Sequence, residues 1–208
     1  REEIAKPLGC DFWIGLPEDK EPRVARLVGT GADDDDGSRI DAIAAVEEYV
    51  GPDAMVVQAL TAGGAFRDGG AWNSRALRAA EVPAAAGVGD ARSVARMYAA
   101  CIGEVDGFRV LDDKASERAR RRRTTGNDIV LLDLDLQFGL GFIVPSTLVT
   151  LGGPNGFGHF GLGGSMGWAD PDAELAFGYV MNRLALGITS DERAYRLVQA
   201  CYDAIARA

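Results

Sequence analysis

The fold is decided by residues 157–181, which read FGHFGLGGSMGWADPDAELAFGYVM. Short apolar runs occupy 157–162, 165–169 and 175–181, and each has the length and residue types of a β-strand. The last two runs are joined by Asp170-Pro171-Asp172, which has the residue types of a tight turn. Because strands joined by tight turns pair in antiparallel fashion, we predict an antiparallel meander here.

The residues on either side extend this pattern. Leu132, Leu134 and Leu136 alternate with polar residues, and 140–144 is apolar, so both segments are predicted as further strands. Downstream, Ser190 is expected to cap a final helix. The apolar stripe of that helix is predicted to comprise Ala194, Leu197, Val198, Cys201 and Ile205.

The first part of the chain has a different pattern. Helical spacing of apolar residues predicts helices over 39–50 and 90–102, separated by glycine-rich loops. We therefore expect an α+β protein, with a mainly helical and loop region over 1–127. Residues 128–208 are expected to form the antiparallel strands and the final helix, and both regions to belong to one incomplete domain.

Five glycines lie between Phe157 and Gly167, in and between the first two predicted strands. Glycine weakens a strand unless another backbone or a ligand must approach it closely. One interpretation is a strand edge that pairs with an extended acyl substrate and offers an N–H group to an oxyanion. The other is a tight corner or bulge of the sheet, and the glycines alone do not decide between them.

His159 is the single histidine, and it lies within this glycine-rich stretch. It is the one candidate base for a Ser-His-Asp triad, yet the chain has no Gly-x-Ser-x-Gly motif. Ser165, in Gly164-Ser165-Met166-Gly167, has the wrong spacing for that motif. A purely structural strand histidine is the alternative, and the surrounding glycines favour a functional role.

Composition narrows the function classes further. The 208 residues carry a formal net charge of −9, which argues against nucleic-acid partners. The acidic run Asp33–Asp36 lacks the spacing of a calcium loop and is expected to be a solvated loop. The cysteines, Cys10, Cys101 and Cys201, are far apart, so we expect free thiols, no metal site and no cofactor.

The chain also lacks the marks of a membrane or secreted protein. No apolar run approaches about 20 residues, and no signal peptide is visible, so we expect a cytoplasmic protein without a membrane partner. The chain begins at Arg1 without a Met, in residues that read as the last turns of a helix. We therefore expect it to be a fragment or a processed product of a longer protein.

Several motifs, taken in order, resemble the β-lactamase-related serine hydrolases, the group with the class C β-lactamase fold that includes many bacterial esterases. They cover nearly the whole chain: 3–9 with 11–16, 72–74, 80–84, 91–98, 158–161, 164–171 and 175–182. The resemblance implies a β-lactamase/transpeptidase-like fold, of which this chain is the C-terminal portion. It also implies a small-molecule ester or amide as substrate.

The resemblance also implies site residues. His159-Phe160-Gly161 matches the Lys-Thr-Gly strand of the family, in the His-x-Gly form of its esterases. His159 would then help proton transfer or orient the substrate, and the backbone N–H of Leu162 would be an oxyanion donor. Phe160, Gly161 and Gly163 would contact substrate. A mostly neutral histidine in place of the lysine cation favours neutral esters over penicillin-like acids.

Two family motifs are missing. None of the seven serines has a lysine three residues later, and Tyr179-Val180-Met181-Asn182 has one residue too many for Tyr-x-Asn. Arg96 follows Ser93 at that spacing, but an arginine cannot act as a base. Ala86 also stands where relatives often carry Asn. We therefore expect the nucleophile to lie in a missing N-terminal segment, which would be the partner of this chain.

The sequence thus predicts the C-terminal part of a carboxylesterase-like serine hydrolase that acts through an acyl-enzyme. Within the same fold, the alternatives are an acyltransferase, a D,D-peptidase or a β-lactamase. From another class, the alternative is a catalytically inactive fragment with a structural or partner-binding role. The 208 residues alone are expected to be inactive.

Overall fold

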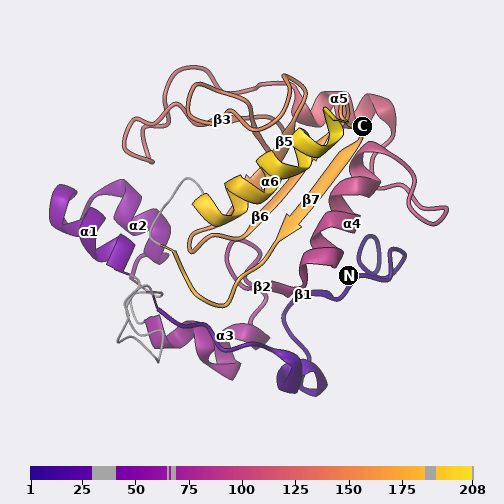
Figure 1. The fold of residues 1–208 in the computed structure, drawn as a ribbon. Helices are drawn as coiled ribbons and strands as arrows, with labels where there is room; N and C mark the ends of the chain where they lie inside the picture. The colour runs from indigo at the N-terminus through magenta and orange to yellow at the C-terminus, as the bar shows by residue number, and fades with distance from the viewer. Residues whose placement is uncertain (30–40, 65, 67–68, 186–190, 208) are drawn as a thin grey trace.

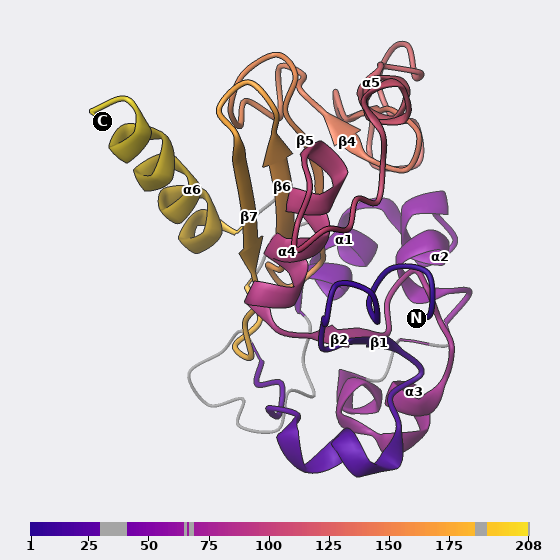
Figure 2. The same ribbon diagram turned by 90° about the vertical axis from the view of Figure 1, so that its right-hand side faces the viewer.

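The computed structural model describes residues 1–29, 41–64, 66, 69–185 and 191–207. A five-stranded antiparallel sheet lies between two helices: α6 (Glu192–Ile205) covers one face and α4 (Ala91–Ile102) the other (Figures 1 and 2). The α+β architecture predicted from the sequence is therefore present. The acidic run Asp33–Asp36 lies outside the described residues, so its prediction as a loop stays a prediction.

The sheet has the strand order β3-β4-β5-β6-β7. Its strands are β3 (Gln137–Phe138), β4 (Ile143–Val144), β5 (Phe157–Phe160), β6 (Met166–Asp170) and β7 (Leu175–Tyr179). The predicted meander is confirmed: β5 pairs with β6 with Phe157 opposite Ala169, and β6 pairs with β7 with Trp168 opposite Phe177. Each strand is a few residues shorter than predicted or shifted by one residue.

The turn between β6 and β7 is built around one buried carboxylate. Asp170 is 1% exposed, and its Oδ1 accepts hydrogen bonds from the N–H groups of Asp172 and Ala173 at 3.0 and 3.4 Å. Its Oδ2 accepts from the Gly153 N–H and from the Tyr202 hydroxyl, both at 2.9 Å. The turn chemistry predicted for Asp170-Pro171-Asp172 is confirmed, and the same carboxylate also binds the C-terminal end of α6.

The strand predicted from the alternation of Leu132, Leu134 and Leu136 is wrong. Leu132 and Asp133 have φ angles of 58° and 59°, which no strand adopts. The Asp128 carboxylate accepts hydrogen bonds from the N–H groups of Val130 and Leu131 at 2.9 and 3.0 Å. These local bonds fold 128–134 into turns, so the alternation of apolar and polar residues does not correspond to two faces of a sheet.

Helix α4 forms as predicted. The Asp90 side chain caps it by accepting from the Ser93 N–H at 2.7 Å, and it ends before Gly103. Gly103 has an extended backbone, so the left-handed cap that glycine often supplies is not used here. The helix packs on the sheet through a cluster of buried residues that includes Cys101, Phe157 and Ala169.

Two predictions for α6 need correction. Its N-cap is Asp191, whose carboxylate accepts from the Arg193 N–H at 2.8 Å, and not Ser190, which lies outside the described residues. Ala194 and Val198 are fully buried against the sheet, with Trp168 and Phe160 in the same cluster. Leu197 and Ile205 are 49% and 44% exposed, so the apolar stripe is wider than the surface that the sheet covers.

The remaining elements lie at the margins of this core. β1 (Phe12–Ile14) and β2 (Gly87–Gly89) form a two-stranded antiparallel sheet. The other helices are α1 (Asp41–Val50), α2 (Met55–Thr61), α3 (Arg75–Ala79), α5 (Asp113–Arg120) and the short 3-10 helices η1 (Glu18–Arg23) and η2 (Gly69–Asn73). Residues 2–9 form hydrogen-bonded turns. In the part of α1 that is described, the predicted helix over 39–50 is confirmed.

The two regions expected from the sequence share one core, because Cys101 of the first packs with Val144 and Phe157 of the second. The boundary at residue 127 itself stays a prediction. A search of the described residues finds no helix with the length and apolar character needed to cross a bilayer.

Candidate functional site: the turn after β5

The connection between β5 and β6 is a tight turn over residues 161–165. The Gly161 N–H donates to the Ser165 carbonyl at 2.8 Å, and the Gly164 N–H donates to the Gly161 carbonyl at 3.1 Å. Gly163 and Gly164 have φ angles of 90° and 118°, which residues with a side chain rarely adopt. The glycines therefore allow the chain to reverse within a few residues at the end of β5.

Leu162 lies in this turn and is half-buried. Within the described part of the chain its N–H has no hydrogen-bond acceptor. A partly exposed backbone N–H that the fold leaves without a partner is able to donate to an oxygen of a bound ligand. The role of Leu162 as an oxyanion donor stays a prediction, and the geometry of the turn is compatible with it.

His159 precedes the turn by two residues and is exposed. Its Nδ1 lies 2.8 Å from the Phe160 carbonyl oxygen. A carbonyl oxygen can only accept, so Nδ1 carries the proton and donates, which leaves Nε2 of the neutral ring as an acceptor. The histidine thus presents a lone pair at Nε2 beside the turn, as a residue that accepts or relays a proton must.

A triad built on His159 has no support in the described residues. The hydrogen bond that the imidazole makes there is to a backbone carbonyl, and neither a serine hydroxyl nor a carboxylate bonds to the ring. The rings of Phe160 and Phe138 lie near the imidazole, at centroid distances of 6.2 and 6.4 Å. That His159 belongs to no triad stays a prediction.

The other predicted site residues differ in how accessible they are. The Phe160 side chain is 6% exposed and belongs to the cluster that packs under α6, so only its backbone is placed to reach a substrate. A Cβ built on Gly161 would meet only the Ser165 hydroxyl, at 2.7 Å, so this glycine keeps an open surface. A Cβ on Gly163 would lie 2.6 Å from Leu184, so Gly163 is covered from outside.

Two of the five glycines serve packing rather than substrate access. A Cβ on Gly158 would lie 2.7 Å from the Trp168 ring, and a Cβ on Gly167 would overlap the Tyr98 ring. These aromatic rings occupy the space that a side chain at either position would need. Gly158 and Gly167 therefore admit large core side chains, whereas the interpretation of the strand edge as a substrate-binding surface stays a prediction.

Sequence reasoning missed the residues that hold the turn from outside. Ala185 donates its N–H to the Gly163 carbonyl at 2.9 Å, and the carboxylate of Asp191 lies against Gly164. Burial raises the pKa of Asp191, but the hydrogen bonds and the charge of Arg193 outweigh it, so the pKa lies below its ordinary value. The available signal was an acidic N-cap two residues before an arginine.

A hollow of about 400 Å³ opens at the same end of the sheet. Its walls include Trp13, Val88 and Met181, so they are largely apolar. The Cε of Met181 also lies 3.4 Å from the position that a Cβ on Gly163 would take. The hollow and the turn therefore share one side chain. Among the described residues, no group of three histidine, cysteine or acidic side chains could hold a metal ion.

An antiparallel sheet between two helices is the α+β architecture of the β-lactamase/transpeptidase-like fold. The chain belongs to the Beta-lactamase family, whose model matches residues 1–201. This agrees with the family resemblance found in the sequence.

Individual relatives are esterases and related proteins. The chain is 34% identical to Esterase/beta-lactamase LipL of Mycobacterium tuberculosis, over 93% of this chain and 44% of that protein. EstA from Arthrobacter nitroguajacolicus Rue61a superposes with a TM-score of 0.79 at 31% identity, over 99% of this chain and 52% of that one. A family VIII carboxylesterase gives 0.76 and 31%, over 97% and 50%.

A penicillin-binding protein homolog from Caulobacter crescentus is also similar, with a TM-score of 0.75 and 30% identity over 98% of this chain and 51% of that one. The chain thus spans about half the length of the relatives that it matches.

Proposed function

We propose that this chain is part of a serine hydrolase of the carboxylesterase type that acts through an acyl-enzyme. The observation that supports it best is that the exposed His159 stands close in sequence to the Leu162 N–H, which has no acceptor among the described residues, at the end of β5. The names of LipL and EstA, and the family VIII carboxylesterase among the similar structures, support an ester substrate.

The proposed reaction has two steps. A serine hydroxyl attacks the ester carbonyl carbon, and the alcohol leaves with the serine proton, which gives an acyl-enzyme. Water then attacks the same carbon, and the carboxylic acid leaves as the serine regains its proton. In both steps the carbonyl oxygen gains negative charge, which the Leu162 N–H would stabilise by donating a hydrogen bond. His159 would accept or relay a proton at Nε2.

The nucleophile is proposed to lie outside these 208 residues, because no serine here has a lysine three residues later. Two features support a further segment of the same protein that packs on this chain. Of the strands described, β7 is outermost on its side of the sheet, so its outer backbone groups are available for another strand. The exposed Leu197 and Ile205 on α6 offer apolar surface for the same segment.

A β-lactamase activity is the second candidate, because the relative LipL is named an esterase/beta-lactamase. His159 argues against it. A histidine imidazole binds the carboxylate of a penicillin-like substrate less well than a lysine ammonium does. We therefore expect hydrolysis of neutral esters to exceed that of a cephalosporin.

The experiment uses the complete protein that contains these residues. Its rate with p-nitrophenyl butyrate is compared with its rate on a chromogenic cephalosporin, and a fluorophosphonate probe tests for a reactive serine. We expect ester hydrolysis and one labelled serine upstream of Arg1. His159→Ala should reduce kcat by about 10²-fold, as expected for loss of a general acid–base group.

Three outcomes would contradict the proposal. An unlabelled, inactive protein would favour the structural or partner-binding role instead. Labelling of a serine within these 208 residues would contradict the external nucleophile. Faster turnover of the cephalosporin than of the ester would favour the β-lactamase alternative.

A further inference from the structure

The N-terminus of α6 contacts the turn that carries Leu162. A Cβ built on Gly164 would lie 2.9 Å from the Cβ of Asp191 and 3.0 Å from its Cγ. Real Cβ atoms do not come this close to carbon, so the Asp191 side chain occupies the space beside the Gly164 backbone. Asp191 is only 4% exposed. The position of Gly164 is therefore limited by a buried carboxylate.

Arg193 fixes this carboxylate. Its Nε lies 3.0 and 2.8 Å from the two carboxylate oxygens of Asp191, and its Nη2 makes an ion pair with Oδ2 at 2.5 Å. The same Nη2 donates to the Arg183 carbonyl at 2.9 Å. A planar guanidinium bound to both oxygens leaves the carboxylate little rotational freedom.

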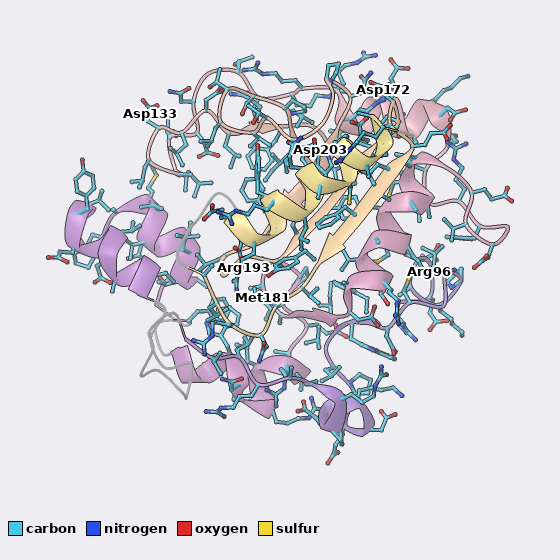
Figure 3. All side chains as sticks on the ribbon, in the orientation of Figure 1. Arg96, Asp133, Asp172, Met181, Arg193 and Asp203 are labelled. Atoms are coloured by element: carbon cyan, nitrogen blue, oxygen red, sulfur yellow. The ribbon has the colours of Figure 1, made fainter. Side chains whose placement is uncertain are left out.

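Hydrogen bonds and packing contacts from residues 183–185 and from Asp191 hold the turn from two sides. Arg193 joins Asp191 to the backbone at Arg183, and two residues later the Ala185 N–H binds the Gly163 carbonyl. Leu184, between them, covers Gly163. The turn is thus held at Gly163 by one backbone segment and at Gly164 by Asp191, and both are linked through Arg193. Figure 3 shows Arg193 and Met181 together at this end of α6.

Arg193 also offsets the negative charge of the Asp191 carboxylate. A carboxylate close to a turn that stabilises an oxyanion would repel the developing negative charge if it stood alone. The ion pair with Arg193 offsets that charge where the side chain is buried. The arrangement therefore supplies steric support to the turn without a net negative charge beside it.

We propose that Asp191, held by Arg193, is a positioning residue that sets the direction of the Leu162 N–H. The proposal rests on the proposed function, because it gives Leu162 the oxyanion as its acceptor. Leu162 is two residues before Gly164, and the bond from the Gly164 N–H to the Gly161 carbonyl spans Leu162. A shift of Gly164 would therefore reorient the peptide units on either side of Leu162.

The chain offers a matched control. Asp170 is also a buried aspartate, 1% exposed, and it also joins α6 to β6, but at the opposite end of the helix through Tyr202. Figure 3 shows Asp203 towards the C-terminal end of α6, away from Arg193 at the N-terminal end. Asp170→Asn should lower stability as Asp191→Asn does, without touching the turn after β5.

The experiment measures ester hydrolysis, thermal stability and affinity for a trifluoromethyl ketone, which forms a tetrahedral adduct, in the complete protein. Asp191→Asn and Arg193→Gln should each lower kcat about 10-fold, less than the loss of a whole oxyanion donor, and leave KM within about 2-fold. Ketone affinity should fall with kcat. The double variant should be no slower than either single variant, since both act through one contact.

Asp170→Asn should leave kcat and ketone affinity unchanged at a similar loss of melting temperature. An unchanged kcat in Asp191→Asn, or an equal loss in Asp170→Asn, would overturn the proposal. A second readout does not need activity: the Leu162 amide resonance should shift in Asp191→Asn and not in Asp170→Asn. If the wild type hydrolyses no ester but this shift appears, the proposed function fails and the positioning of the turn stands. If the resonance does not move, the positioning fails.

Discussion

The hydroxyl of Tyr202 donates a 2.9 Å hydrogen bond to the buried carboxylate of Asp170, and so joins the last turns of α6 to the end of β6. The same carboxylate oxygen also accepts from the Gly153 N–H. Desolvation, and the hydrogen bond and charge of Asp170, raise the pKa of Tyr202, so the phenol stays a donor at neutral pH.

We expect Tyr202→Phe to lower the free energy of unfolding by about 1–2 kcal/mol, because a buried carboxylate loses one of its donors. Urea denaturation followed by circular dichroism measures the change. Tyr195→Phe is the control: its hydroxyl pairs with Thr150 at an exposed site, so its effect should stay below about 0.5 kcal/mol. Equal effects of the two substitutions would show that Asp170 gains nothing from Tyr202.

Gly167 is the second test, because the Tyr98 ring covers it within contact distance. Gly167→Ala should destabilise the protein by about 2–3 kcal/mol through overpacking. Combining it with Tyr98→Leu should recover part of that loss, which a double-mutant cycle on urea unfolding measures.

Gly103→Ala is the matched control for Gly167→Ala. Gly103 has an extended backbone, and the nearest atom to its Cβ position is the Ala99 carbonyl oxygen at 3.9 Å. This substitution should change the free energy of unfolding by less than about 0.5 kcal/mol. A loss at Gly103 as large as that at Gly167 would contradict the packing explanation.

Stability should fall in mildly alkaline solution because of Cys101. Burial raises the pKa of this thiol to about 11, so between about pH 9 and 11 the folded protein keeps a proton that the unfolded chain releases. The free energy of unfolding should therefore drop by about 1.4 kcal/mol per pH unit in that range. Urea titrations of Cys101→Ala at pH 7–11 should show a shallower decline than the wild type, and parallel curves would contradict the prediction.

The exposed side of α6 gives a test of the proposed packing partner. In the complete protein, Leu197→Lys should lower the free energy of unfolding by about 2 kcal/mol, because it replaces a buried apolar contact by a charge. Gln199→Lys adds the same charge on the opposite side of the helix, where Gln199 is exposed, and should be nearly neutral. If both variants unfold alike, Leu197 faces solvent and the proposed segment packs elsewhere.

Much of the sheet could be predicted from the sequence, because the turn residues around Asp170 and the apolar runs on either side of them fix three paired strands. The strand predicted from the alternation of Leu132, Leu134 and Leu136 was wrong. Periodicity does not reveal that the Asp128 carboxylate accepts hydrogen bonds from two backbone N–H groups. Local hydrogen bonds of this kind compete with a sheet and leave no trace in the spacing of apolar residues.

The part of the candidate site that could be predicted is the part marked by an unusual residue, the single histidine. A single histidine among glycines identified His159 and the turn after it. The support of that turn was not predictable, because Asp191 and Leu184 follow it by some twenty residues or more and contact it only in the folded chain. The packing of Tyr98 on Gly167 likewise joins residues that are far apart in sequence.

Helix α6 is held at both of its ends: its N-cap Asp191 contacts the turn after β5, and Tyr202 in its last turn binds Asp170 of β6. A helix held at one end frays from the other, one turn at a time. Because both ends of α6 are held, fraying has no free end at which to start. Its interior amides should therefore exchange with deuterium as one cooperative group, at a rate set by the opening of β6, even though its outer surface is exposed.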